Sequence, residues 1–145
     1  MSESIHIVCP HCDAVNRIAA DRPAAEAICG KCKQPLFSGK PIALTAQTFD
    51  KQVERNDIPV IVDFWAEWCG PCRAMAPVFE RAAKELEPRA RLAKVNVDEE
   101  PAIAARYGIR GIPTLIVFDH GKVLKQHAGL VDMNFLRGLV KATVA

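Results

Sequence analysis

The six cysteines of this chain fall into three Cys-x-x-Cys pairs, and this spacing constrains the fold more than any other feature. The pairs are Cys9/Cys12, Cys29/Cys32 and Cys69/Cys72. Such spacing in a reducing compartment is typical of metal ligation or redox catalysis rather than of structural cross-links. The three pairs need not share one role, so the residues around each pair must decide it.

The chain has 145 residues, half of them hydrophobic, which suits one domain of ordinary size with a small appendage. Its net charge is +2 and no basic block stands out, which gives no support for binding nucleic acid or a membrane surface. The apolar runs are far shorter than the ~18 residues of a spanning helix. The N-terminus also lacks the pattern of a secretory signal, although processing can remove one. We therefore expect a cytoplasmic protein with no membrane partner.

The first two cysteine pairs lie in residues 1–40, where the apolar residues are scattered without a helical or strand period. The C-x2-C-x16-C-x2-C spacing predicts a zinc site, because zinc prefers four thiolates in a tetrahedron. The predicted ligands are Cys9, Cys12, Cys29 and Cys32. Two disulfides or a second redox shuttle are the alternatives. Zinc binding would supply the folding free energy that such a small core lacks.

The turn-like residues 38–41 divide the chain into a zinc-binding domain at 1–40 and a second domain at 41–145. Strands are expected at 42–44, 59–65, 91–97, 114–119 and 122–127, and helices at 45–56, 70–87, 99–106 and 132–144. This βαβαβαββα order predicts an α/β fold with a central mixed sheet flanked by helices. Its strands should be parallel early in the chain and form an antiparallel hairpin at the end.

The third cysteine pair follows the apolar strand 59–65 and stands where the next helix begins. The free N–H groups and the dipole at a helix N-terminus favour a thiolate, with further help from hydrogen bonds that Cys72 can donate. Pro71 suits the first turn because it has no N–H, and Gly70 leaves room for a partner's backbone. We expect an accessible Cys69 to attack a disulfide and a more shielded Cys72 to resolve the mixed disulfide. A third metal knuckle is the alternative.

Two charged residues interrupt the expected apolar strands. Asp63 lies within strand 59–65, where burial would raise the pKa of its carboxyl and let it accept the Cys72 proton through water. Lys94, in strand 91–97, is the candidate charge partner of Asp63. A partly solvated aspartate and a lysine that extends into solvent are the alternatives.

The segment VDFWAEWCGPC, the helix proline Pro77, the segments AKVNVD and YGIRGIPTL, and the late Gly129 together resemble the thioredoxin family. The resemblance covers about residues 42–145. It implies the thioredoxin fold and a protein disulfide reductase that cycles between a Cys69–Cys72 dithiol and a disulfide. The implied partners are disulfide-containing proteins and a thioredoxin reductase that draws on NADPH.

The resemblance also implies the residues around the redox centre. The peptide bond before Pro113 should be cis, which would bring the Ile112 backbone beside Cys69. Trp65 and Trp68 would flank the centre, and Lys94 and Trp65 are the expected supporting residues. The implied docking rim is Trp68, Gly70, Pro71, Ile112, Pro113 and Gly129. For the tryptophans and Gly129, plain packing and turn geometry are the alternatives.

A zinc segment in front of such a domain is similar to the bacterial thioredoxin 2 group. The segment could be a structural addition, a partner-binding surface or an oxidant sensor, and we favour a structural role that also tunes the redox centre. A disulfide oxidase or isomerase is a rival function, against which the Gly-Pro dipeptide and the missing signal argue. A zinc-dependent binding module is another, against which the intact CGPC argues. We expect a monomer.

Overall fold

The computed structural model describes residues 4–143. Its strands are β1 (Ile5–Val8), β2 (Val15–Ile18), β3 (Ile42–Ala43), β4 (Val60–Trp65), β5 (Arg91–Asn96), β6 (Thr114–Asp119) and β7 (Lys122–Ala128). Its helices are α1 (Phe49–Arg55), α2 (Gly70–Leu86), α3 (Pro101–Arg106) and α4 (Met133–Thr143), with a single 3₁₀ turn at Ala24–Glu26. From residue 42 onward the order is the predicted βαβαβαββα. Val144, the last residue of the predicted final helix, lies outside the described residues.

The central sheet has the order β3-β5-β4-β6-β7. Its strands β3, β5 and β4 are parallel, whereas β6 runs antiparallel to both β4 and β7. The hairpin between β6 and β7 turns at His120 and Gly121, which have φ values of 50° and 84°. Two successive residues with positive φ match the twist of a tight hairpin. The predicted mixed sheet and its late hairpin are therefore confirmed.

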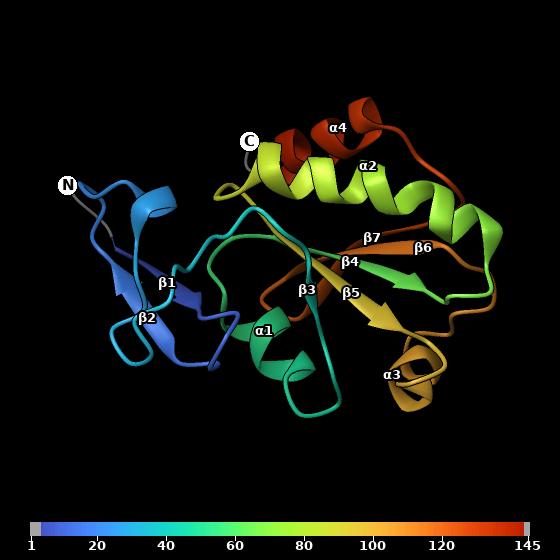
Figure 1. Ribbon diagram of the computed structural model, residues 1–145, viewed down its shortest axis with the longest axis horizontal. Coiled ribbons are helices and arrows are strands. Elements are labelled where there is room, and N and C mark those ends of the chain that lie inside the picture. Colours follow the sequence, from blue (N-terminus) through green and yellow to red (C-terminus); the bar gives the residue numbers. More distant parts are fainter. Residues whose placement is uncertain (1–3, 144–145) are drawn as a thin grey trace.

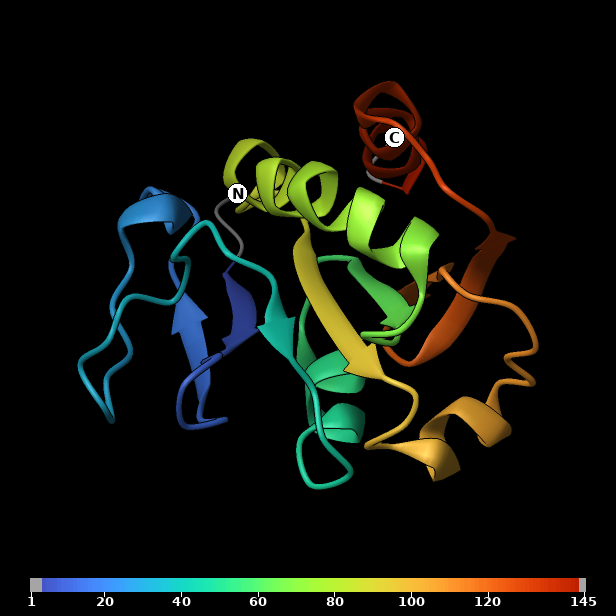
Figure 2. The same cartoon turned by 45° about the vertical axis from the view of Figure 1, so that its right-hand side comes forward.

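Helices cover both faces of this sheet. Figures 1 and 2 show α2 and α4 on one face and α1 and α3 on the other. One core lies under α2 and α4 and contains Phe79 and Leu136, and the other contains Phe49 and Phe118. Strand β4 lies in the middle, with its first five residues buried. The C-terminal end of β4 therefore fixes the position of residues 66–69, which connect it to α2.

Helix α1 is shorter than the sequence predicts. It begins at Phe49 rather than at residue 45. The Thr48 side chain does not cap the helix; its Oγ1 accepts the backbone N–H of Thr45 at 3.0 Å. That bond closes a separate turn before the helix, because threonine hydroxyls compete with the helix for nearby backbone groups.

Residues 4–40, here called the N-terminal segment, contain regular structure that the sequence analysis missed. Strands β1 and β2 form an antiparallel hairpin. Ile7 and Leu36 pack in a small core that is completed by Ile58 from beyond the segment. No strand was predicted here, and that was wrong. Each strand has only four residues, which is too short for an alternating apolar pattern to be recognised. Residues 41–143 are called the sheet domain below.

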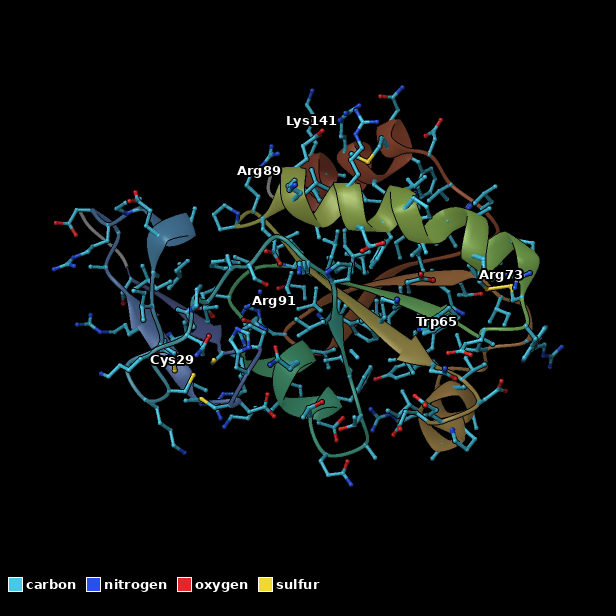
Figure 3. The ribbon with its side chains drawn as sticks, viewed as in Figure 1. Cys29, Trp65, Arg73, Arg89, Arg91 and Lys141 are labelled. Atoms are coloured by element: carbon cyan, nitrogen blue, oxygen red, sulfur yellow. A yellow bond between two sulfur atoms is a disulfide. The ribbon has the colours of Figure 1, made fainter. Side chains whose placement is uncertain are left out.

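The cysteine pairs lie at opposite ends of the molecule. Figure 3 shows Cys29 in the N-terminal segment at one end and Arg73, which follows Cys72, at the other. The sheet domain spans the length between them (Figure 1). No helix within residues 4–143 is long and apolar enough to cross a membrane.

Candidate functional site

The third cysteine pair forms a disulfide between Cys69 and Cys72 at the start of α2. Cys69 is the N-cap residue, with an extended backbone, and Pro71 lies in the first turn. The backbone N–H of Cys72 donates to Cys69 Sγ at 3.2 Å. This contact shows how the helix start would stabilise a Cys69 thiolate, since a free N–H group points at the sulfur.

The loop before β6 lies against this disulfide. The Ile112–Pro113 peptide bond is cis, as the resemblance implies, and the Ile112 carbonyl oxygen lies 3.6 Å from Cys69 Sγ. Gly129, which follows β7, donates its N–H to the Pro113 carbonyl at 2.8 Å. Its φ of 111° favours glycine, so turn geometry is one reason for a glycine at this position. The loop before β6 therefore lies against the Cys69–Cys72 disulfide and is held by the turn after β7, although these segments are far apart in the sequence.

The disulfide is less accessible than the sequence analysis predicts. Cys69 is only 4% exposed and Cys72 is 2% exposed, because Trp65 and Ile112 pack around them. Trp68 is 68% exposed and is the most exposed of the large hydrophobic residues in the described chain. Gly70 and Pro71 lie next to the sulfurs at the first turn of α2. The two sulfurs are therefore nearly buried, whereas the ring of Trp68, the residue before Cys69, is exposed.

Asp98 is a neighbour of this site that sequence reasoning missed. Its Oδ2 accepts the indole Nε1–H of Trp68 at 2.8 Å, which fixes the orientation of an otherwise exposed ring. The only sequence signal is its place at the end of the AKVNVD segment, after β5. Nothing in that segment specifies the residue that its carboxylate contacts.

Asp63 is buried on β4 as predicted, with 2% of its surface exposed. Burial raises the pKa of its carboxyl to about 7, against the opposing charge of Lys94. The two residues are direct neighbours across the parallel strands β4 and β5. The Lys94 ammonium, however, lies over the Trp65 ring, 4.4 Å from its centre, and Asp63 Oδ1 has no hydrogen-bond partner within residues 4–143. The structure therefore brings all three residues together, with a nearby charge but no ion pair.

The comparisons with known proteins agree with this geometry. The family model described as Thioredoxin matches residues 40–142. The chain belongs to the thioredoxin family. A second model, described as Thioredoxin 2, N-terminal, matches residues 8–34.

Relatives and a solved structure extend this match. Thioredoxin C-3 from Corynebacterium nephridii is 41% identical over 113 residues, which are 78% of this chain and 77% of that protein. Thioredoxin 1 from a Nostoc species is 48% identical over 93 residues, or 64% of this chain and 87% of that protein. A mutant thioredoxin from Halobacterium salinarum superposes with a TM-score of 0.66 at 37% identity, covering 72% of this chain and 90% of that one. This thioredoxin is thus a thiol–disulfide oxidoreductase, a protein disulfide reductase of a family that acts on disulfide substrates and is recycled by a reductase.

The other four cysteines of this thioredoxin form a compact cluster in the N-terminal segment. The Sγ atoms of Cys9, Cys12, Cys29 and Cys32 all lie within 4.8 Å of one another, and none of these cysteines is in a disulfide. The Cys9–Cys32 and Cys12–Cys29 Sγ atoms are 3.6 Å and 3.7 Å apart. Four thiolates about 2.3 Å from a tetrahedral zinc ion would be separated by about 3.8 Å. The cluster therefore has the dimensions of a metal site.

Each half of this cluster is a tight turn, called here the first knuckle (residues 9–14) and the second knuckle (residues 29–34). Backbone N–H groups point at the sulfurs: His11 donates to Cys9 Sγ at 3.3 Å, and Lys31 donates to Cys29 Sγ at 3.4 Å. Hydrogen bonds, chiefly from the Cys32 N–H, lower the pKa of Cys29 to about 5, whereas burial raises the pKa of Cys9 to about 12. A bound metal ion would replace the remaining thiol protons.

Proposed function

We propose that Cys69 is the nucleophile and Cys72 the resolving thiol of disulfide reduction. The Cys69 thiolate attacks a substrate disulfide, forms a mixed disulfide and releases one substrate thiolate. The Cys72 thiolate then attacks Cys69 Sγ, releases the second substrate thiolate and leaves the Cys69–Cys72 disulfide, so two electrons pass to the substrate. The observation that carries this order is the Cys72 N–H that points at Cys69 Sγ at the start of α2.

We infer that Asp63 accepts the proton of the Cys72 thiol, through water, before that second attack. A carboxyl with a pKa of about 7 can both take and return a proton near neutral pH. The supporting residues are Lys94, whose charge opposes the rise of this pKa, and Trp65, which holds the Lys94 ammonium over its ring. Asp63 thus acts as a proton acceptor for the resolving step and has no contact with substrate.

Asp63→Asn is expected to slow turnover and at the same time to stabilise the fold. The raised folded-state pKa means that the wild-type protein holds the Asp63 proton while the unfolded chain has lost it. Its stability should therefore fall as pH rises from about 4 to about 7 and stay lower above that range. The variant lacks this penalty, so chemical denaturation should show it more stable by a few kcal/mol at pH 8 and equal near pH 4.

The exposed Asp21→Asn is the matched control, and it should leave both the pH dependence of stability and the turnover unchanged. The rate of disulfide reduction should be followed from pH 6 to 9. Unaltered rates of Asp63→Asn over that range would rule out the proton-acceptor role, whatever the change in stability.

We further propose that substrates bind over the rim formed by Trp68, Gly70, Pro71, Ile112, Pro113 and Gly129. Backbone groups of Ile112 lie against the sulfur and suit pairing with an extended substrate strand. The proposed substrates are disulfide-containing proteins, and the proposed recycling partner is a thioredoxin reductase that uses NADPH. The protein would act in the cytoplasm as a monomer, with domains at 1–40 and 41–145. The test is NADPH-driven reduction of a disulfide protein by the full chain with such a reductase.

We propose zinc as the metal of the four-cysteine cluster, with a structural role. All four ligand atoms are sulfur, and the distances between the Sγ atoms suit tetrahedral coordination. Structural zinc sites prefer both features. The ion would join the two knuckles of a segment that has only a small core of its own. The distance of this cluster from the redox pair favours a structural role over tuning of that pair (Figure 3).

The full chain is expected to contain one zinc ion, and Cys32→Ser is expected to lose it almost completely. Removing one of four thiolates opens the tetrahedron, and the N-terminal segment should lose stability with it. Metal content is measured by atomic emission after gel filtration. Cys72→Ser is the matched control: it should keep its zinc and lose catalytic turnover. Full zinc content in Cys32→Ser would contradict the assignment.

A further inference from the structure

The two knuckles of the metal cluster contain the same pair of backbone hydrogen bonds. In the first knuckle, the Cys9 N–H donates to the Ala14 carbonyl at 2.8 Å, and the Asp13 N–H donates to the Cys9 carbonyl at 3.0 Å. In the second knuckle, the N–H groups of Cys29 and Lys33 make the two equivalent bonds at 2.9 and 3.0 Å. The two turns therefore share the same backbone–backbone hydrogen bonds, and they differ in the side-chain contacts that hold them.

Buried polar side chains of the sheet domain hold the first knuckle. Gln52 on α1 is 1% exposed, and its Nε2 donates to the Cys9 carbonyl at 3.0 Å and to Asp13 Oδ1 at 2.9 Å. Asn56, four residues later, donates to Gln52 Oε1 at 3.2 Å, which leaves the Gln52 amide nitrogen facing the knuckle. Asn56 Oδ1 also accepts the Val8 N–H at 2.8 Å. The two amides thus connect α1 to the residue before Cys9, to Cys9 itself and to the end of the turn.

A buried arginine of β5 holds the same stretch of chain from another direction. Arg91 is fully buried, and its Nη2 donates to the Val8 carbonyl at 3.1 Å. The guanidinium also lies 4.6 Å from the centre of the Phe37 ring. With Asn56 on its N–H and Arg91 on its carbonyl, Val8 is fixed on both sides immediately before Cys9.

The second knuckle has no such support in the described part of the chain. The hydrogen bonds of residues 29–33 all stay within the N-terminal segment, where Asn16 accepts the Gly30 N–H at 2.8 Å and donates to Cys29 Sγ at 3.4 Å. Gly30, Lys31 and Lys33 are exposed, although Cys29 is buried in the small core, whereas the first knuckle is mostly half-buried. Only its own segment and a bound metal hold this turn.

We propose that Gln52 positions the first knuckle as the preformed half of the metal site, and that the metal enters and leaves by opening of the second knuckle. The inference rests on the proposed zinc site. Opening the second knuckle breaks bonds that water can replace, whereas opening the first would leave buried polar groups of the sheet domain without partners. Gln52 is thus a positioning residue that acts on the metal through the backbone of Cys9.

Amide hydrogen exchange in the full chain, with zinc and after its removal by a chelator, tests this order of opening. After removal, the Cys9 and Asp13 amides should exchange at least about tenfold more slowly than the equivalent Cys29 and Lys33 amides. With zinc bound, all four should be protected. Equal exchange in the two knuckles of the metal-free chain would overturn the inference.

The variant Gln52→Met, which keeps the side-chain length but removes the amide, tests the positioning role. Competition with a chromogenic chelator should show zinc bound about tenfold more weakly, the lower end of the usual effect of an outer-shell contact. The exposed Gln126→Met is the matched control and should bind zinc as the wild-type chain does. Unchanged zinc affinity in a folded Gln52→Met would overturn the inference.

Two measurements keep this inference separate from the zinc assignment. If Gln52→Met does not fold, the comparison of the two knuckles in the wild-type chain still decides. A wild-type chain that binds no stoichiometric zinc would overturn the metal assignment and the inference with it. Equal exchange of the knuckles in a chain that does bind zinc would overturn the inference alone.

Discussion

Cys69→Ser is expected to lower disulfide reduction roughly a thousandfold or more, the order of loss that follows removal of a covalent nucleophile. The serine hydroxyl cannot form the mixed disulfide, so no covalent intermediate should appear. Cys72→Ser should also fail to turn over, but for a different reason: its mixed disulfide forms and cannot be resolved. Non-reducing electrophoresis and mass spectrometry with a disulfide protein distinguish the two variants.

The pair of variants therefore tests the order of attack. A substrate adduct on Cys72→Ser and none on Cys69→Ser is the expected pattern, and the reverse pattern would exchange the two roles. The double variant with serine at both positions addresses the rival function of a binding module. A binding module would keep its function in that variant, whereas a reductase would lose it.

Glu87→Ala is expected to destabilise the fold by about 3–5 kcal/mol, the usual cost of leaving one partner of a buried ion pair alone. Glu87 Oε2 lies 3.3 Å from Arg91 Nη1, and both side chains are almost completely buried. Burial raises the pKa of Glu87 and lowers that of Arg91, and the attraction between the two charges opposes both shifts. Glu87 also accepts the Gly39 N–H at 3.0 Å, which adds to the loss. Urea denaturation of the full chain measures the change.

Glu85→Ala, two residues earlier in the last turn of α2, provides the matched control. Glu85 pairs with Arg137, but both side chains are more than one third exposed, so its loss should cost less than about 1 kcal/mol. Replacing Glu87 and Arg91 together by methionine should recover much of the stability, because no buried charge remains. Equal costs for Glu85→Ala and Glu87→Ala would show that burial does not set the strength of the pair.

The parts of the fold that the sequence predicts well are those in which one local signal is strong. Strand β4 is a continuous apolar run, and Asp63 was identified because it is the one charge within it. The two knuckles and the redox pair were separated by spacing and by the strand-then-helix context of Cys69. The start of α1 was predicted at residue 45 rather than 49, because a hydrogen-bonded turn closed by Thr45 and Thr48 directly precedes the helix.

The contacts between the two parts of the chain could not be predicted in this way. Arg91 begins an expected strand, a place where an arginine commonly meets solvent, and its acceptor on Val8 is 83 residues away. A weaker signal was present in α1 and its C-cap, where Gln52 and Asn56 continue the spacing of the apolar residues Phe49 and Val53. Polar residues on the apolar stripe of a helix indicate a polar neighbour, and here that neighbour is the backbone of the first knuckle.

The placement of the two sulfur centres at opposite ends of the sheet has a chemical consequence. A nucleophile that exchanges disulfides would also react with other cysteines of its own chain if they came within reach. The four free cysteines of the N-terminal segment are far from Cys69, beyond the length of the sheet domain (Figure 3). The sheet domain therefore keeps the four thiols of the N-terminal segment out of reach of the exchanging dithiol. No disulfide between the two groups of cysteines should form within one molecule.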